Sequence, residues 1–301
     1  NQPLILFEYL QKCSSEGRAP DSAEAARAVR GSASDKKTLR LVMSELLAQI
    51  EHFWVYRELF AETANFDIRL AAAYRKRGLE KHFRQRLRAA RIAWERQPYR
   101  HTEYFDAQAA IEYELYQHLS AGRRTEALNG QQLLDQTDTA YIARKLRQAC
   151  FALSHQTVYK ADYEFGLLGA VLQHVRQSEA LRQIPAVALY FYCYLFLTDP
   201  DDETYFFQFK SILFGHLDQL PTDEQRNLHL LAINFCIRKI NQLHPAYFRE
   251  ALDLYQSALK ADLLLENNQL SHFAYNNIVA IALRSAIRTG RKLLSIDMRR
   301  F

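Results

Sequence analysis

The chain has 301 residues, of which 49% are hydrophobic, and its 39 Lys and Arg against 34 Asp and Glu give a net charge of +5. This is enough apolar material for a large core, and the charge is too small to indicate a nucleic-acid partner by itself. Only 9 Gly and 7 Pro are present, and they stand between apolar-periodic segments, which predicts an almost entirely helical protein.

The first part of the chain predicts helices of uneven length. Residues 1–12 have a short amphipathic pattern without the basic segment of a signal peptide, and residues 14–34 predict a loop with a short Ala-rich helix. Residues 35–60 predict a long helix with Asp35 as its N-cap and one apolar face. That face comprises Leu39, Val42, Met43, Leu46, Leu47, Ile50, Phe53 and Trp54.

The next helices are bounded by Gly and Pro. A helix over 65–77 is expected to end at Gly78 in the left-handed conformation, and the helix that follows runs to Pro98. Residues 102–120 predict another helix, which ends at Gly122. Residues 124–157 fit either two helices broken near Thr137 or one continuous helix, and the pattern does not decide between them.

An internal period begins near residue 138. Cys150, Cys193 and Cys236 are 43 residues apart, a further step of 43 reaches Val279, and each lies in the middle of an apolar helical segment. After each of the first three comes a break and a second amphipathic segment, at 161–175, 203–217 and 246–259. The repeating unit is therefore a pair of helices whose apolar face only the next pair can cover.

The most apolar stretch is Ile184–Leu197, fourteen residues without a charge. A helix that is apolar on every side must be buried on every side. At about 1.5 Å per residue it is shorter than the roughly 20 residues that span a bilayer. It therefore predicts a core helix, with no membrane insertion.

Short connections follow this helix. Asp199-Pro200 is expected to end it, Thr222 or Asp223 to cap a later helix, and Pro245 to stand at or near the start of another. A final helix is expected over 271–288.

The segment AAAYRKRGLEKHF, residues 71–83, places small residues and a Tyr on one helix, a Gly at the turn and an aromatic on the next. It resembles a tetratricopeptide turn, although the period of 43 exceeds the 34 residues usual in that family. With residues 35–59, 230–241 and 275–284, the chain is similar to a group of uncharacterised bacterial tetratricopeptide-like (TPR-like) α-solenoid proteins. The resemblance implies a fold and brings no activity with it.

The period and the resemblance together predict an all-α, right-handed α-solenoid of about six antiparallel helix pairs. We expect one elongated helical-repeat domain over 1–301, with an irregular N-terminal half at 1–137, more regular repeats at 138–289 and a short basic tail at 290–301. The helix over 271–288 has the pattern of the first helix of a pair, yet little of the chain follows it. We therefore expect either a longer natural solenoid or a two-fold homodimer through the C-terminal end.

The strongest charge feature is Arg69–Arg100, which holds eleven Lys or Arg against two Glu, a balance of +9. At about 100° per residue, Leu79, Phe83, Leu87, Ala90 and Trp94 share one stripe of the helix over 79–97. A solvated outer face is the plain interpretation, and a site for a polyanion or an acidic partner is the alternative. The candidate residues opposite the apolar stripe are Lys81, Arg84, Arg88 and Arg91.

A second candidate site follows from the period. Asn234 and Asn277 are 43 residues apart on the first helices of successive pairs, so they would stack side by side in a solenoid. In tetratricopeptide proteins the first helices line a concave groove, where Asn can hold the backbone of a ligand. The plain alternative is that these amides hydrogen-bond between neighbouring helices.

Motifs of catalysis and metal binding are absent from the sequence. It has no HExxH, GxSxG, P-loop or GxGxxG, and none of its ten His has a Glu three residues before it. The four Cys are far apart in apolar segments, typical of small buried hydrophobes in a reducing compartment, which favours the cytoplasm. We therefore expect no catalytic residues, no metal and no cofactor.

These observations favour a non-enzymatic protein-interaction scaffold. It would bind a protein or peptide through the solenoid groove or through its basic N-terminal face. The alternative is a protein that associates with nucleic acid or another polyanion through Arg69–Arg100. An enzyme whose site is assembled only by folding has the least support.

Overall fold

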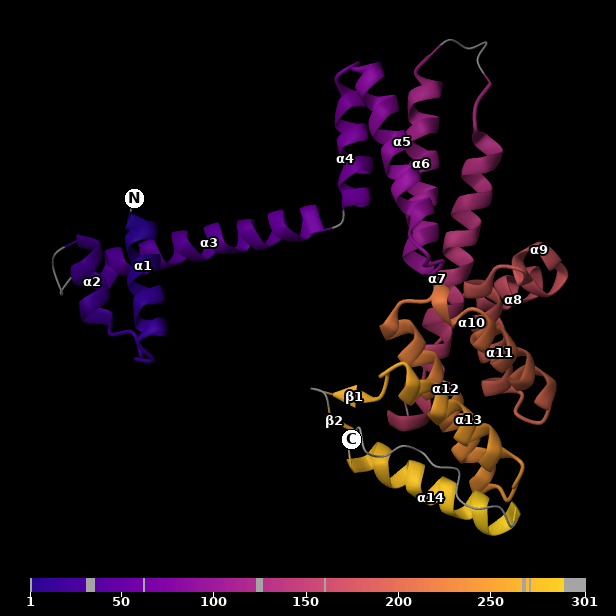
Figure 1. Cartoon of the computed structure of the whole chain (residues 1–301). Helices are drawn as coiled ribbons and strands as arrows, with labels where there is room; N and C mark the ends of the chain where they lie inside the picture. Colours follow the sequence, from indigo (N-terminus) through magenta and orange to yellow (C-terminus); the bar gives the residue numbers. More distant parts are fainter. Residues whose placement is uncertain are drawn as a thin grey trace. The chain divides into compact units, whose positions relative to one another are not determined.

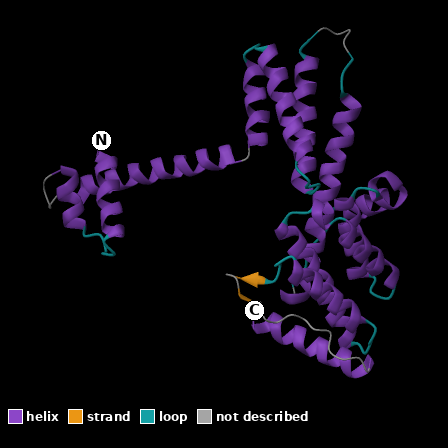
Figure 2. Cartoon of the chain, viewed as in Figure 1, coloured by secondary structure: helices purple, strands orange, loops and turns teal. Residues whose placement is uncertain are grey.

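The computed structural model describes residues 2–30, 36–61, 63–122, 127–159, 161–266, 269–270 and 272–289. In this part of the chain nearly every element is an α-helix, and one short hairpin is its only sheet (Figure 2). The predicted all-α class is therefore confirmed. Asp35, the expected N-cap, and residues 290–301, the expected basic tail, lie outside the described residues.

Contacts divide the chain into two compact units, residues 1–90 and 91–301. The predicted change of character near residue 137 falls within a single helix of unit 2. Figure 1 labels the helices in chain order. Unit 1 contains α1 (Gln2–Ser15), α2 (Ser22–Arg30), α3 (Lys36–Ala61), α4 (Thr63–Lys76) and the first turns of α5 (Glu80–Arg96).

The turn between α4 and α5 has the predicted glycine geometry. Gly78 has a φ of +68°, in the left-handed region that a Cβ would strain. The Leu79 N–H donates to the Tyr74 carbonyl at 3.0 Å and so satisfies an end of α4. The apolar stripe predicted on α5 is buried at Phe83, Leu87, Ala90 and Trp94. Leu79 is 42% exposed because it precedes the first turn of the helix.

Unit 2 contains the helices that carry the 43-residue period. A 3₁₀ turn, Leu217–Gln219, precedes α12, and an antiparallel hairpin of β1 (Leu265–Glu266) and β2 (Gln269–Leu270) separates the last two helices. The helices are α6 (Thr102–Ser120), α7 (Gly130–Tyr159), α8 (Leu168–Gln177), α9 (Glu179–Arg182), α10 (Pro185–Thr198), α11 (Glu203–Gly215), α12 (Thr222–Asn241), α13 (Tyr247–Lys260) and α14 (His272–Thr289).

The predicted core helix is α10, and it lies against α7, α11 and α12. Every side chain from Ala186 to Phe191 is buried, and Cys193 and Phe196 have no exposed surface. Pro185 stands at the first helical position, where its fixed φ suits the helix and its missing N–H costs nothing. The helix ends at Thr198 with Asp199 as its C-cap, as the Asp-Pro pair predicts. Burial is thus confirmed for most of the helix, while Tyr192, Tyr194 and Leu197 are half-buried.

The three periodic cysteines are all buried in the core of unit 2. Cys150 on α7, Cys193 on α10 and Cys236 on α12 are fully buried, and α10 contacts both of the other helices. The Cys150 Sγ donates to the carbonyl oxygen of Tyr190 at 3.3 Å. Burial raises the pKa of the Cys150 and Cys236 thiols. Both thiols therefore stay protonated, as the sequence predicts.

Two boundaries differ from the predictions. The segment at 161–175 is helical only from Leu168, because Gly166 adopts a left-handed φ of +53° just before it. The cap predicted at Thr222 or Asp223 is wrong, since Thr222 is already helical and Pro221 is the N-cap, without a side-chain cap bond. The hairpin of two-residue strands carries too few residues to show a period in the sequence.

The region that the sequence left undecided is one helix, α7, from Gly130 onward. The hydroxyls of Thr137 and Thr139 donate to carbonyls one turn earlier, at 2.7 and 2.8 Å. Such bonds let Thr stand inside a helix without leaving its hydroxyl unpaired. The polar Thr-Asp-Thr run is therefore compatible with an unbroken helix.

We expect Leu189→Ala to lower the free energy of unfolding by about 2–5 kcal/mol, because it opens a cavity beneath a fully buried side chain. Denaturant unfolding followed by circular dichroism measures this change. Leu134→Ala on α7 is the control, since Leu134 is 60% exposed and should change stability by no more than about 0.5 kcal/mol. A loss below about 1 kcal/mol for Leu189→Ala would remove α10 from the centre of the fold.

His229, on α12, is a buried titratable group within this core. Its Nδ1 lies 2.7 Å from the Gln225 carbonyl oxygen and its Nε2 lies 3.1 Å from the Ser257 Oγ on α13. A carbonyl only accepts, so Nδ1 carries the proton and Nε2 accepts from the Ser257 hydroxyl. Burial lowers the pKa of His229 and outweighs the bond to Gln225, which raises it. The imidazole is therefore neutral at pH 7.

The stability of unit 2 should fall as the pH drops below about 6.5, the ordinary pKa of His. The unfolded chain then takes up a proton that folded His229 resists, which favours the unfolded state. We expect His229→Gln to be less stable at pH 7.5 and to lose less stability between pH 7.5 and pH 5 than the native chain. Denaturant unfolding at a series of pH values measures both, and equal pH slopes would contradict the assignment.

Candidate functional site

The predicted basic face of α5 is only partly free. Lys81 and Arg88 are exposed, and within the part of the chain that the structure describes neither forms an ion pair. Arg84 bonds to Glu80 one turn earlier at 2.9 Å. Arg91 reaches α6, where it donates to Glu112 at 2.7 Å. The four predicted residues therefore do not form one uniform basic surface.

The prediction that Arg91 lies on the outer face is wrong. At about 100° per residue it lies roughly 40° from Leu87, at the edge of the buried stripe. Its partner Glu112 is 9% exposed and also accepts a bond from the Asn129 side chain at 2.8 Å. Arg91 thus neutralises a nearly buried carboxylate. An acidic residue in place of Arg91, which an outer-face position would tolerate, would put a second carboxylate beside Glu112.

Other cations of the Arg69–Arg100 stretch are also engaged. Arg86 pairs with buried Asp67 on α4 at 3.2 Å. Arg100 donates to the carbonyls of Glu95, Gln97 and Tyr99. Internal contacts therefore use several of the charges that make this stretch basic, and they reduce what is offered to an external anion.

We expect Arg91→Glu to destabilise unit 2 by about 1–3 kcal/mol, a range that allows for the half-exposed guanidinium. Arg88→Glu, on the exposed face of the same helix, should stay within about 0.5 kcal/mol of the native chain. Denaturant unfolding of the two variants gives the comparison. Equal effects would show that the Arg91–Glu112 pair does not support the fold.

The two candidate Asn residues have different surroundings. Asn234 is exposed on α12, whereas Asn277 on α14 is half-buried and hydrogen-bonds the side chain of Tyr255 on α13. α13 and α14 pack together. Asn277 therefore fits the plain alternative, a bond between neighbouring helices, and Asn234 alone remains available to a partner.

Sequence reasoning missed a partly buried polar cluster where α6, α7, α10 and α12 meet. This Arg147 cluster contains Glu103, Arg147, Tyr190 and Glu224. Glu224 is 2% exposed and accepts a bond of 2.5 Å from the Tyr190 hydroxyl. Arg147 lies 3.6 Å from Glu224 and 3.3 Å from Glu103. Burial, followed by the charge of Glu224, raises the pKa of Tyr190 well above its usual value, so the phenol keeps its proton.

The Arg147 cluster joins helices, and its groups face one another. One guanidinium stands between two carboxylates, and the phenol donates to the more buried of the two. Its members are far apart in sequence, and Glu224 lies in the first turn of α12, where an acid is expected for helix stability alone. Among the described residues, no group of three or more His, Cys, Asp or Glu could hold a metal ion.

An extended exposed apolar surface lies on α3. Leu39, Val42 and Leu46 pack under α1 and α2 and confirm the buried half of the predicted face. Every residue from 51 to 60 is exposed, including the predicted face residues Phe53 and Trp54. The predicted face is therefore covered only in its first part, because α1 and α2 have 14 and 9 residues against the 26 of α3.

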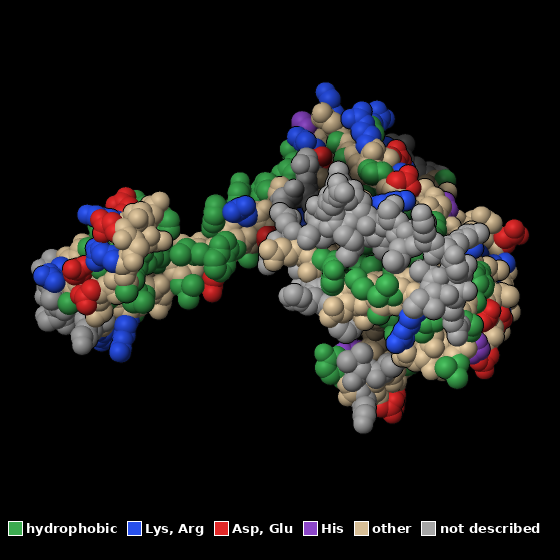
Figure 3. Space-filling model, turned by 60° about the horizontal axis from the view of Figure 1, so that its bottom comes forward, with side chains coloured by type: hydrophobic (Ala, Val, Ile, Leu, Met, Phe, Trp, Pro, Cys, Tyr) green, Lys and Arg blue, Asp and Glu red, His purple; other side chains and the backbone are tan. Residues whose placement is uncertain are grey.

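We call residues 51–60 the aromatic segment of α3. Phe53, Trp54, Val55 and Tyr56 are each between 56% and 59% exposed, and Leu59 and Phe60 are also exposed. Figure 3 shows hydrophobic side chains gathered along this helix. Four consecutive large apolar residues occupy all sides of a helix, which in a stable protein requires a cover on all sides. The uninterrupted run of large apolar residues at 53–56 is the sequence signal that could have identified this surface.

A pocket of about 570 Å³ adjoins the aromatic segment. Its floor is the buried ends of Leu6 on α1 and Leu46 on α3, and its rim includes Arg40 and Ser44. The volume falls within the range of about 300–1,000 Å³ that is usual for ligand pockets. Its other lining residues, Leu10, Met43, Leu47 and Ile50, are apolar. The pocket therefore suits a large apolar side chain.

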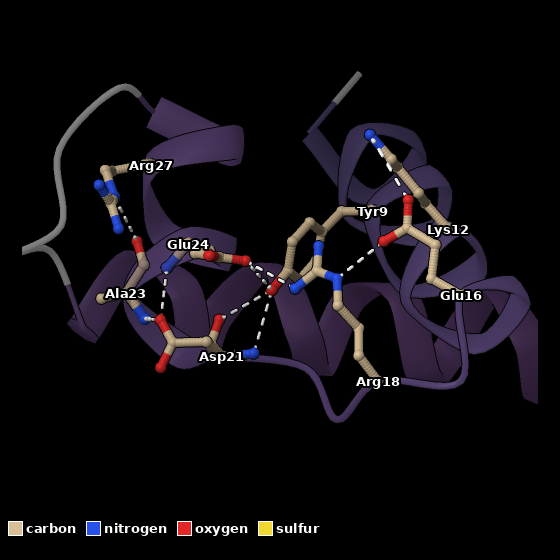
Figure 4. Close-up of polar contacts among 8 residues, drawn as sticks. All are labelled: Tyr9, Lys12, Glu16, Arg18, Asp21, Ala23, Glu24 and Arg27. Carbon is tan, nitrogen blue, oxygen red and sulfur yellow. Dashed lines mark hydrogen bonds and ion pairs between the residues drawn. The ribbon is translucent and has the colours of Figure 1, made fainter.

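A polar cluster holds α1, one wall of this pocket, against α2 (Figure 4). Arg18, in the connection between the helices, bonds Glu16 at 2.9 Å and Glu24 at 2.8 Å, and its guanidinium lies 5.6 Å from the Tyr9 ring centre. The Tyr9 hydroxyl donates to Glu24 at 3.1 Å. The bond from Arg18 lowers the pKa of Glu24. These contacts fix the α1–α2 turn and so position Leu6 and Leu10 over α3.

Comparison with family models, with curated proteins and with solved structures found no match. Among the helices of the described residues, none is long and apolar enough to cross a membrane. The chemistry of the chain's own surface is therefore the basis on which a function can be assigned.

Proposed function

We propose that this chain is a non-enzymatic protein-interaction protein that binds a protein or peptide partner through the aromatic segment of α3 and the adjoining pocket. The exposure of ten consecutive helical positions, six of them large and apolar, carries the proposal. Contiguous exposed apolar surface of this kind marks sites of protein association. Aromatic residues in particular supply the anchors of such interfaces.

This proposal moves the partner site from the basic face of α5 to α3. The helix pairs of unit 2 support the finer architectural proposal, a TPR-like solenoid, because Cys150, Cys193 and Cys236 are buried on helices that touch in turn. Four buried free thiols support a reducing compartment such as the cytoplasm. Nucleic-acid association has weaker support, since Arg84, Arg86, Arg91 and Arg100 engage groups of the chain itself.

A photo-crosslinking amino acid in place of Val55 tests the surface. It should form covalent adducts with protein when the full chain is expressed in its native cell, because residue 55 lies inside the proposed interface. The same amino acid at Leu134, an equally exposed apolar position on α7, is the control and should give few adducts. Trp54→Ser should remove the adducts at residue 55 and leave the fold intact, as circular dichroism can check.

Adducts of equal strength at both positions would overturn the proposal, because they would show no preference for α3. Adducts that join residue 55 only to residues 91–301 of the same molecule would also overturn it, since the surface would then be internal to the fold.

A further inference from the structure

We propose that the partner seated on α3 is a second copy of this chain, in an antiparallel two-fold pairing of α3 helices in which each Trp54 enters the other copy's pocket. This inference deepens the proposed function and rests on it. It follows from the positions of three features along one stripe of a single helix: a pocket, a protruding indole and two opposite charges.

The pocket and the indole lie on the same side of α3. At about 3.6 residues per turn, positions seven apart lie within roughly 20° of one another, so Trp54 follows Leu47 along one line. Leu47 lines the pocket with Met43 and Ile50. Trp54 is 59% exposed and projects from the part of α3 that no pocket wall accompanies. One helix thus carries a hollow toward its start and a matching projection toward its end.

A two-fold axis brings these features together twice. In an isologous pairing, residue i contacts residue j while j contacts i. With the axis near residues 49–50, antiparallel α3 helices place Trp54 of one copy opposite residues 44–46 of the other. Each indole then meets the pocket formed by Leu6, Leu10, Met43 and Leu47. A parallel arrangement would set Trp54 beside Trp54 and leave both pockets empty.

The charges at the two ends fit the same axis. Arg40 stands on the pocket rim, and Glu58 lies 18 residues further along α3. Eighteen residues make about five whole turns, so the two side chains leave the helix on the same side. Neither side chain forms an ion pair with another described residue. The axis that seats Trp54 places Arg40 of each copy opposite Glu58 of the other. Two reciprocal ion pairs thus flank two reciprocal indole contacts.

The paired stripe offers apolar area around each indole. Trp54 is 59% exposed, and Met43 and Leu47 on the same stripe are each 52% exposed. Large aromatic side chains bury roughly 150–250 Å² each, so the indole alone has on the order of 100 Å² left to bury. The pocket walls Leu6 and Leu10 on α1 add to this area. Phe53, Tyr56 and Phe60 lie about 100–160° from Trp54 around the helix and are outside this stripe.

Sedimentation equilibrium of the purified 301-residue chain, over about 0.1–100 µM, tests the pairing. We expect a reversible monomer–dimer equilibrium. Trp54→Ala should raise the dimer Kd at least about thirtyfold, the effect of an interface anchor. Leu134→Ala should leave the Kd unchanged. In a Trp94→Phe background, which makes Trp54 the sole Trp, emission should shift to shorter wavelength as the dimer forms.

Charge exchange distinguishes a second copy from any other occupant. Glu58→Arg and Arg40→Glu each place like charges opposite one another twice per dimer, and each should raise the Kd about tenfold. The two variants mixed in equal amounts should form heterodimers, because one chain then carries positive charges at both positions and the other carries negative charges at both. The double variant should recover dimerisation alone. No such pattern can arise within one chain, where residues five turns apart on a helix do not touch.

A chain that stays monomeric throughout this range would overturn the pairing. So would a dimer that survives Trp54→Ala, or single-charge variants that fail to associate preferentially when mixed. These failures are separate from failure of the proposed function: strong adducts at residue 55 with a different protein, together with a monomeric purified chain, would reject the second copy and keep the interaction surface.

Discussion

Unit 2 depends on the burial of one uncharged helix. The apolar side chains of α10 have no polar face to turn toward water, so α7, α11 and α12 must surround it for the unit to exist. This constraint explains why Cys150, Cys193 and Cys236 are fully buried, since they lie on helices held together around one apolar centre. It also explains the cost of polarity there: Glu224 enters this region only with Tyr190 and Arg147 as partners.

The same rule gives the opposite result in unit 1. α3 carries a run of four large apolar residues, at 53–56, that resembles the runs of α10, yet the chain's own helices cover only the half of α3 beneath α1 and α2. A core and an exposed surface are here made from similar short sequences, and the difference is whether the described part of the chain supplies covering helices. The polar cluster around Arg18 strengthens this contrast, because it holds the short helices in place without extending their cover.

Most helices could be predicted because their signals are local. Gly78 marks a turn through its backbone freedom, and Pro185 at the first helical position and Asp199 at the C-cap mark the ends of α10. The candidate sites could not be predicted as well because they depend on contacts between distant residues. Arg91 differs from Arg88 by where α6 lies, and the pairing of Tyr190 with Glu224 joins positions whose spacing matches no motif. Phe53 and Trp54 fit a buried face by periodicity, and only the lengths of α1 and α2 expose them.

The position of α10 in the chain also has a consequence for biosynthesis. α7 precedes it, but α11 and α12 follow over residues 199–241. At about 5–20 residues per second, translation takes roughly 2–9 s to deliver these 43 residues after α10 is complete. During that interval an uncharged apolar helix has been synthesised, and two of the helices that cover it have not. Nascent chains that end between residues 198 and 241 are therefore the stage at which this protein depends most on chaperones that hold apolar segments.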